Sequence, residues 1–168
     1  NNLMLTTTDK IKELFTTFSK AEITSIDKLP QAGSERHYFR IHTVDKNYIA
    51  TYGANVKENE SFIYFSEHFK KKGLATAQIL AINKEKDIYI QLDFGDVSLL
   101  NELEQHGYVE SVYNLYKESL HQLALLQVKG HEGLDYKKCL TNSSFGKEAI
   151  MADLLYFKYY FLDALRKP

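Results

Sequence analysis

The spacing of apolar residues over the first 94 positions predicts a small sheet preceded by one helix. Apolar residues at helical spacing predict a helix over residues 9–20 with Thr8 as its N-cap; they are Ile11, Leu14, Phe15 and Phe18. Short apolar or alternating runs, separated by turn residues, then predict five strands, over 23–29, 37–43, 48–52, 77–82 and 87–92. Tight turns separate the first three strands, so we expect them to form an antiparallel meander.

A second helix is predicted between the third and fourth strands. Asn55 is placed to cap it, with Glu58 at the third helical position in the manner of a capping box, and Gly73 is placed to end it. Glu58 shares one face of this helix with three aromatic residues, which are Phe62, Phe65 and Phe69.

After residue 94 the pattern becomes helical. Helices are predicted over 97–106, 109–129 and 147–166, with a loop over 133–144 and Gly130 as the stop of the long helix. The inner stripe of the long helix is expected to be Val112, Tyr116, Leu120 and Leu123. The last helix is apolar nearly all round, so we expect further chain after Pro168, or a partner, to cover it.

Composition and charge limit the function classes. Lys and Arg number 21 and Asp and Glu 22, so the net charge is −1, and we expect neither nucleic acid nor an anionic membrane as partner. A single cysteine, Cys139, allows neither an internal disulfide nor a cysteine metal site. The sequence shows no signal peptide and no apolar run of the ~18 residues that a spanning helix needs, so we expect a cytoplasmic protein.

Motifs of several common enzyme classes are absent from the sequence. Gly146-Lys147 resembles the end of a phosphate-binding loop, but Glu148 follows where Ser or Thr is required. His131-Glu132 is not followed by the second histidine of a zinc-binding helix, and the six histidines show no ligand spacing. We therefore expect neither a hydrolase nor a metal site built from the residues of this chain.

The order of the predicted elements, together with four segments, resembles the aminoglycoside phosphotransferase and choline kinase family. The segments are 33–41, 49–53, 57–62 and 88–96. Among its members the chain is most similar to the bacterial branch that phosphorylates N-acetylmuramate and N-acetylglucosamine. The resemblance covers roughly residues 22–165.

This resemblance implies an α+β fold. Residues 1–94 would form a protein-kinase-like N-lobe that binds nucleotide, a five-stranded antiparallel sheet plus one inserted helix. Residues 95–168 would form the first helices of an incomplete helical lobe. The implied activity is that of a small-molecule kinase with ATP or GTP and Mg²⁺ as cofactors, acting on a sugar or amino-sugar hydroxyl.

The resemblance also implies the residues of a nucleotide site. The turn between the first two strands would fold over the phosphates, through Gly33, Ser34, Glu35 and Arg36. Arg36 or Arg40 would direct positive charge toward a phosphate, or would form an ordinary surface ion pair.

Two acids and one connecting segment complete the implied site. Glu58, or Glu60 in its place, would be the helix acid that pairs with a cation, the alternative role of Glu58 being helix capping. The backbone of the connector would bind the base, through Gln91, Leu92, Asp93 and Phe94. Asp96 and Ser98 would lie near the mouth of the nucleotide cleft. Their alternative role is to cap the helix that follows.

The sequence departs from the family pattern at two places. The third strand carries no Lys or Arg over 49–52, where such kinases place one, unless Arg36 or Arg40 supplies the charge. The catalytic pattern His-x-Asp-x-x-x-x-Asn and a later metal-binding Asp do not occur in 1–168. Catalytic residues are therefore expected beyond Pro168, the remainder of the chain is an expected partner, and residues 1–168 alone are expected to be inactive.

Two other functions stay open at this point. The chain could be a non-catalytic kinase-like module that binds a nucleotide or a partner. Alternatively, it could be an α+β interaction domain whose aromatic helix over 147–166 docks a partner.

Overall fold

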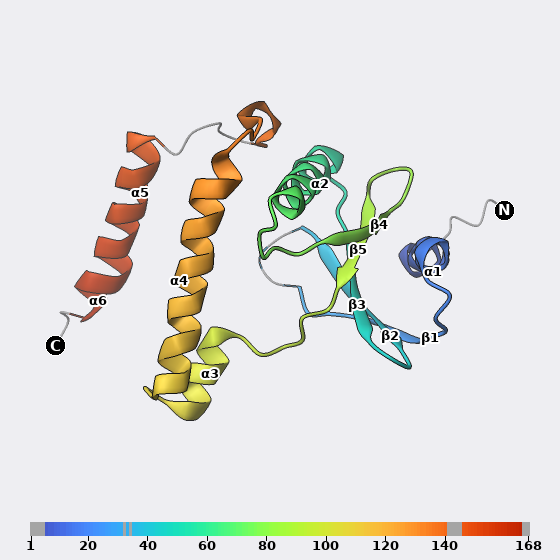
Figure 1. The fold of residues 1–168 in the computed structure, drawn as a ribbon, viewed down its shortest axis with the longest axis horizontal. Coiled ribbons are helices and arrows are strands. Elements are labelled where there is room, and N and C mark those ends of the chain that lie inside the picture. Colours follow the sequence, from blue (N-terminus) through green and yellow to red (C-terminus); the bar gives the residue numbers. More distant parts are fainter. Residues whose placement is uncertain (1–5, 32, 34, 141–145, 166–168) are drawn as a thin grey trace. The chain divides into compact units, whose positions relative to one another are not determined.

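The computed structural model describes residues 6–31, 33, 35–140 and 146–165, and divides the chain into two compact units, residues 1–134 and 135–168 (Figure 1). The larger unit contains, in order, α1 (Thr7–Phe18), β1 (Ile23–Lys28), β2 (His37–Thr43), β3 (Asn47–Tyr52), α2 (Val56–Lys71), β4 (Ile79–Ile82), β5 (Ile88–Leu92), α3 (Leu99–His106) and α4 (Glu110–His131). The smaller unit contains η1 (Tyr136–Lys138), α5 (Lys147–Phe157), η2 (Lys158–Leu162) and α6 (Asp163–Leu165).

The five strands form one antiparallel open sheet in the order β1-β2-β3-β5-β4. The meander and the five strands predicted from the sequence are confirmed, with β4 beginning at Ile79, two residues later than expected. The two outer strands are irregular, because the register shifts between Ile23 and Ser25 in β1 and between Ile79 and Ala81 in β4. The protein is therefore α+β, with an open sheet followed by helices.

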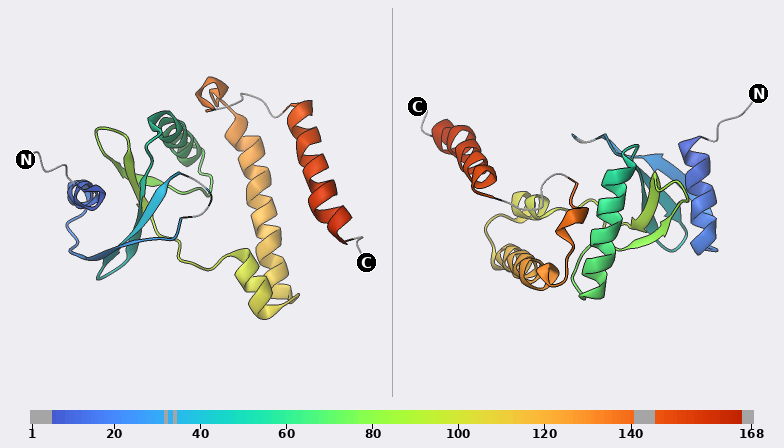
Figure 2. Two further views of the ribbon diagram at one scale, coloured as in Figure 1. Left: turned by 180° about the vertical axis from the view of Figure 1, so that it is seen from behind. Right: turned by 90° about the horizontal axis from the view of Figure 1, so that it is seen from above.

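Helix α1 covers one face of the sheet (Figure 2). Ile11 and Phe15 are fully buried against strand residues of the core, and Phe15 meets the Tyr48 ring edge to face at 5.2 Å. The predicted cap at Thr8 is wrong. Thr6 caps the helix, because the Thr6 hydroxyl accepts the Asp9 N–H while the Asp9 carboxylate accepts from Thr6, which completes a capping box.

Helix α2 packs on the opposite face of the sheet (Figure 2). Its ring contact with the sheet is Phe62 on Tyr89, with centroids 5.1 Å apart, and the Ser66 hydroxyl donates to the Ala77 carbonyl at 2.8 Å. The predicted cap is confirmed, since the Asn55 side chain accepts the Glu58 N–H. The sheet is thus held between two helices, of which α2 carries the candidate acid.

Helix α4 is longer than predicted, and Gly130 is not its stop. Gly130 is buried inside the helix, and a Cβ there would lie 3.0 Å from the Phe69 ring of α2. His68 Nε2 donates to the Gly130 carbonyl at 2.8 Å, so the glycine allows α2 and α4 to approach closely. The helix ends instead before Gly133, whose φ is +74°.

The stripe predicted for α4 is only partly buried. Val112 is buried, whereas Tyr116, Leu120 and Leu123 are exposed, Leu120 by 65%. In the smaller unit the predicted helix over 147–166 forms as α5, a π-helical turn (η2) and α6, and its last residue lies outside the described ones. No helix among the described residues has the length and apolar character needed to span a membrane.

Candidate functional site

The face of the sheet that meets α2 carries two of the candidate residues, Arg40 and Gln91. The register aligns Tyr38 with Thr51 and Thr51 with Tyr89, and in the next row it aligns Arg40 with Ile49 and Ile49 with Gln91. Because side chains alternate along a strand, both rows point to the same face. Strand β2 thus presents Arg40 on this face, and Arg36 directly precedes the strand.

Arg36 forms an ion pair with the candidate helix acid. The Arg36 Nη2 lies 2.8 Å from Glu58 Oε1, and the guanidinium lies over the Phe62 ring, 5.6 Å from its centroid. The Arg36 side chain is 17% exposed and that of Glu58 38% exposed, so the pair is partly desolvated. Of the two roles that the sequence left open for the Glu58 side chain, the structure shows pairing. The cation that meets Glu58 comes from Arg36, the residue before β2, and β3 itself carries no Lys or Arg.

Glu60, the other candidate acid, lies at a different place. Its carboxylate pairs with Lys86 in the turn between β4 and β5, with 2.6 Å between Lys86 Nζ and Glu60 Oε1, and both side chains are about half exposed. The structure therefore pairs Glu58 with Arg36 and Glu60 with Lys86.

Tyr89 belongs to the same cluster and was not predicted as a site residue. It is 2% exposed and stacks on Phe62. Burial raises the pKa of its phenol, while the charge of Arg36 and a hydrogen bond with Thr51 act in the opposite direction and do not cancel the effect. The phenol therefore stays protonated at neutral pH. Its sequence signal is weak, because it is one tyrosine between two isoleucines in a short strand.

Asn59 is a second residue that the sequence did not reveal. It is fully buried, and its amide nitrogen donates to the carbonyl oxygens of Gly53 at 2.7 Å and Lys86 at 2.9 Å. These bonds connect the first turn of α2 to the end of β3 and to the β4–β5 turn. Because Glu58 is the preceding residue, the same bonds hold Glu58 where it meets Arg36.

Arg40 is engaged by two carboxylates of the connector between β5 and α3. Its guanidinium donates to Asp93 at 2.6 and 3.4 Å and to Asp96 at 2.7 and 2.9 Å. Hydrogen bonds to Asp96 and then Asp93 raise the pKa of Arg40, and the Arg40 hydrogen bond lowers the pKa of Asp96. Of the roles left open for Arg40, the structure shows ion pairing.

Two of the remaining connector residues, Gly95 and Ser98, have partners within the protein. Ser98 caps α3 in a capping box with Asn101, so of its two open roles the structure shows capping. Gly95, with φ +82°, donates its N–H to Asp93 at 2.8 Å. Gln91 is half-buried, and the Phe94 side chain is 74% exposed.

Arg40 and Arg36 are four residues apart in sequence, which corresponds to ~13 Å along an extended chain.

The turn before β2 is described only in part. Gly33 has φ +47°, a left-handed conformation that favours glycine, and Glu35 is exposed. Ser34 lies outside the described residues.

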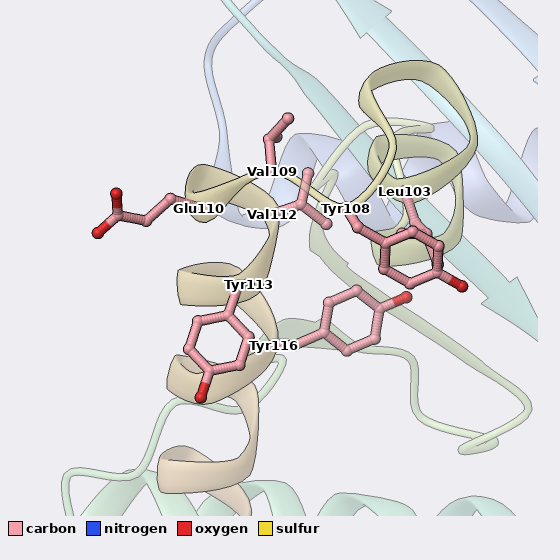
Figure 3. A pocket seen from close by; sticks show the side chains of 7 residues that line it. All are labelled: Leu103, Tyr108, Val109, Glu110, Val112, Tyr113 and Tyr116. Carbon is pink, nitrogen blue, oxygen red and sulfur yellow. The ribbon is translucent and has the colours of Figure 1, made fainter.

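An apolar pocket lies apart from these residues, between α3 and α4 (Figure 3). Its volume is about 540 Å³, and its lining includes Leu103, Val112 and three tyrosines, Tyr108, Tyr113 and Tyr116. In Figure 3 the Glu110 carboxylate points away from the tyrosine rings. The pocket therefore offers apolar and aromatic surface with phenol hydroxyls, and no charge directed into it.

Magnesium has no evident ligand set here. Within the described part of the chain, no group of three or more His, Cys, Asp or Glu side chains is arranged to hold a metal ion. The carboxylates near the candidate site are paired with arginine, Glu58 with Arg36 and the two aspartates with Arg40. The described residues alone do not fit a Mg²⁺ site.

Compared with known proteins, the sequence matches no model of a protein family and no curated protein.

Proposed function

We propose that this chain is the nucleotide-binding part of a small-molecule phosphotransferase with a protein-kinase-like N-lobe, which uses ATP or GTP to phosphorylate a sugar or amino-sugar hydroxyl. The observation that carries the proposal is the Arg36–Glu58 ion pair at 2.8 Å. Phosphoryl transfer relies on positioning and on positive charge at the phosphates. Kinases of this kind hold that cation with an acid from the inserted helix. Here the acid is in the expected helix, and an arginine from the neighbouring turn meets it.

In this proposal the two arginines lie at opposite ends of a bound nucleotide. Arg36 follows the turn that contains Gly33 and binds the phosphates, for which its planar fork of donors is suited. Glu58 orients Arg36, and Asn59 holds the helix turn from which Glu58 projects. The connector backbone at Gln91–Phe94 binds the base. Tyr89 and Phe62 form the apolar surface between the phosphate end and the base end of the site.

No step of phosphoryl transfer is assigned to the described residues. The acid that orients the acceptor hydroxyl and the acid that binds Mg²⁺ are expected after Pro168, in the remainder of the chain. A cytoplasmic location, where nucleoside triphosphates are available, accords with this proposal.

The test compares MgATP with adenosine. Millimolar MgATP or MgGTP should raise the melting temperature of the chain, because a ligand present at 100 times its Kd stabilises the folded state by ~2.7 kcal/mol. Arg36→Gln should weaken the binding of MgATP at least tenfold and leave that of adenosine unchanged, since only the phosphates meet Arg36. Glu58→Gln should have a smaller effect in the same direction.

Glu60→Gln is the matched control, because it removes an acid of the same helix that pairs elsewhere, with Lys86. It should leave both affinities unchanged. Failure of the unsubstituted chain to bind either nucleotide at millimolar concentration would contradict the proposal. An equal loss of MgATP affinity in the Glu58 and Glu60 variants would contradict the role of the ion pair.

A second candidate is a non-catalytic kinase-like module that binds nucleotide or a partner. It is favoured by β3, which carries neither Lys nor Arg over Asn47–Tyr52. Incubation of the full-length protein with labelled MgATP and N-acetylglucosamine or N-acetylmuramate separates the two, because only the enzyme forms a phosphosugar.

A third candidate, an interaction domain that docks a partner through α5, is favoured by exposed apolar side chains such as those of Leu154 and Tyr156.

A further inference from the structure

A partly buried ion-pair cluster lies at the end of the site away from Arg36. The side chains of Arg40 and Asp93 are 14% and 6% exposed, whereas that of Asp96 is 79% exposed. Arg40 donates four hydrogen bonds to the two carboxylates, two to each. Paired donors of this kind fix orientation as well as distance, because the guanidinium is planar.

The cluster joins segments that are distant in sequence. Asp93 is 53 residues and Asp96 is 56 residues from Arg40, so one side chain of β2 holds the connector at two points. Between them, the Gly95 N–H donates to Asp93 Oδ1 at 2.8 Å, and the Asp93 N–H donates to the Asn47 carbonyl at 3.3 Å. The path of the connector backbone is therefore set by contacts within the protein.

We infer that Arg40, Asp93 and Asp96 form a connector clamp, which fixes the backbone of residues 93–96 and thereby sets the affinity of the site for the base. This inference rests on the proposed function and assigns Arg40 a different role from Arg36. Arg40 is a positioning residue: its donors engage carboxylates, so it does not act as a phosphate ligand. A backbone that is already ordered loses less conformational freedom when it binds.

Asp96→Asn gives the sharpest test, because the exposed Asp96 carboxylate can be neutralised while the buried Arg40–Asp93 pair is kept. Hydrogen exchange of the Gly95 amide should become several-fold faster, while amides of β3 and β5 keep their rates. Adenosine and MgATP should both bind about three- to tenfold more weakly and by the same factor, because the base is common to both. Arg40→Lys should act in the same direction, since the lysine ammonium group lacks the paired N–H donors of the planar guanidinium. Lys86→Gln, which removes an exposed ion pair at the other end of β5, should change neither exchange nor affinity.

The outcomes separate this inference from the function on which it rests. If the unsubstituted chain binds neither adenosine nor MgATP, the proposed function fails and the role of the clamp in affinity fails with it. If the unsubstituted chain binds both, and Asp96→Asn binds both equally well, the clamp alone is overturned. A loss confined to MgATP would also overturn it, because Arg40 would then act on the phosphates.

Discussion

Replacing Gly53 by alanine should destabilise the fold through one buried side chain. A Cβ at position 53 would lie 2.5 Å from Asn59 Oδ1 and 3.2 Å from its amide nitrogen, and Asn59 is fully buried. To make room, Asn59 must move and lose its hydrogen bonds to the carbonyls of Gly53 and Lys86. Each such bond contributes about 1 kcal/mol, and the carbonyls left without a partner add to the loss.

With two hydrogen bonds lost, the expected net change in unfolding free energy is about 2 to 4.6 kcal/mol. Overpacking a filled site costs roughly 1–3 kcal/mol. The lower entropy of the unfolded chain with alanine offsets about 0.4–1 kcal/mol. For a chain of this size, the melting temperature should fall by about 4 to 18 °C.

Urea denaturation followed by circular dichroism measures the change. Gly146→Ala serves as the control, since a Cβ there would meet its nearest neighbour, Glu148 Oε2, at an ordinary 3.5 Å. Adding Asn59→Ala to Gly53→Ala should cost less than the sum of the two single changes, because the smaller side chain removes the clash. A Gly53→Ala variant as stable as the unsubstituted chain would refute the reasoning, and so would strict additivity.

Three further predictions concern stability. Ser66→Ala removes the 2.8 Å bond to Ala77 and should lower the unfolding free energy by about 1 kcal/mol in urea titrations; no change would show that the bond adds nothing. Gly107→Ala should cost about 1–3 kcal/mol in the same assay, because Gly107 has φ 71° and ψ −161°, a conformation open almost only to glycine. The pKa of the Tyr89 phenol is raised in the folded chain. Its contribution to the free energy of unfolding is therefore fully present below the pKa of about 10 that it has in the unfolded chain, and is lost as pH rises through the pKa of the folded chain. Tyr89→Phe should flatten the fall in stability above about pH 10, and parallel curves would contradict this.

Most of the fold could be predicted because it depends on local periodicity. The alternation of strands and the spacing of helical residues located all five strands and the longer helices, with bounds displaced by a few residues, whereas the short helix η1 lies where a loop was expected. The other exceptions are the cap of α1 and the role of Gly130, which depend on contacts with other residues. Three threonines precede Ile11, and the capping one is Thr6, because Asp9 stands three residues after it. Gly130 has the local character of a helix stop, but the Phe69 ring packs against it, a contact that only the tertiary structure reveals.

The candidate site was less predictable because its pairs are distant in sequence. Arg36 and Arg40 were both candidates for a phosphate or an ion pair, and strand register decides which acid each one meets. Asn59 was missed because it binds backbone carbonyls, which carry no side-chain signature. Tyr89 was missed because burial, and not residue type, raises its pKa.

The irregular outer strands have a consequence for self-association. β1 and β4 are the two edges of an open sheet, and a regular edge is a template for strand pairing with another chain. Each edge is interrupted by a register shift, and β4 is only four residues long. Bulges bend a strand and break the ladder of backbone donors and acceptors. The sheet should therefore resist edge-to-edge aggregation at high concentration, which helps a protein with an open sheet to stay dispersed.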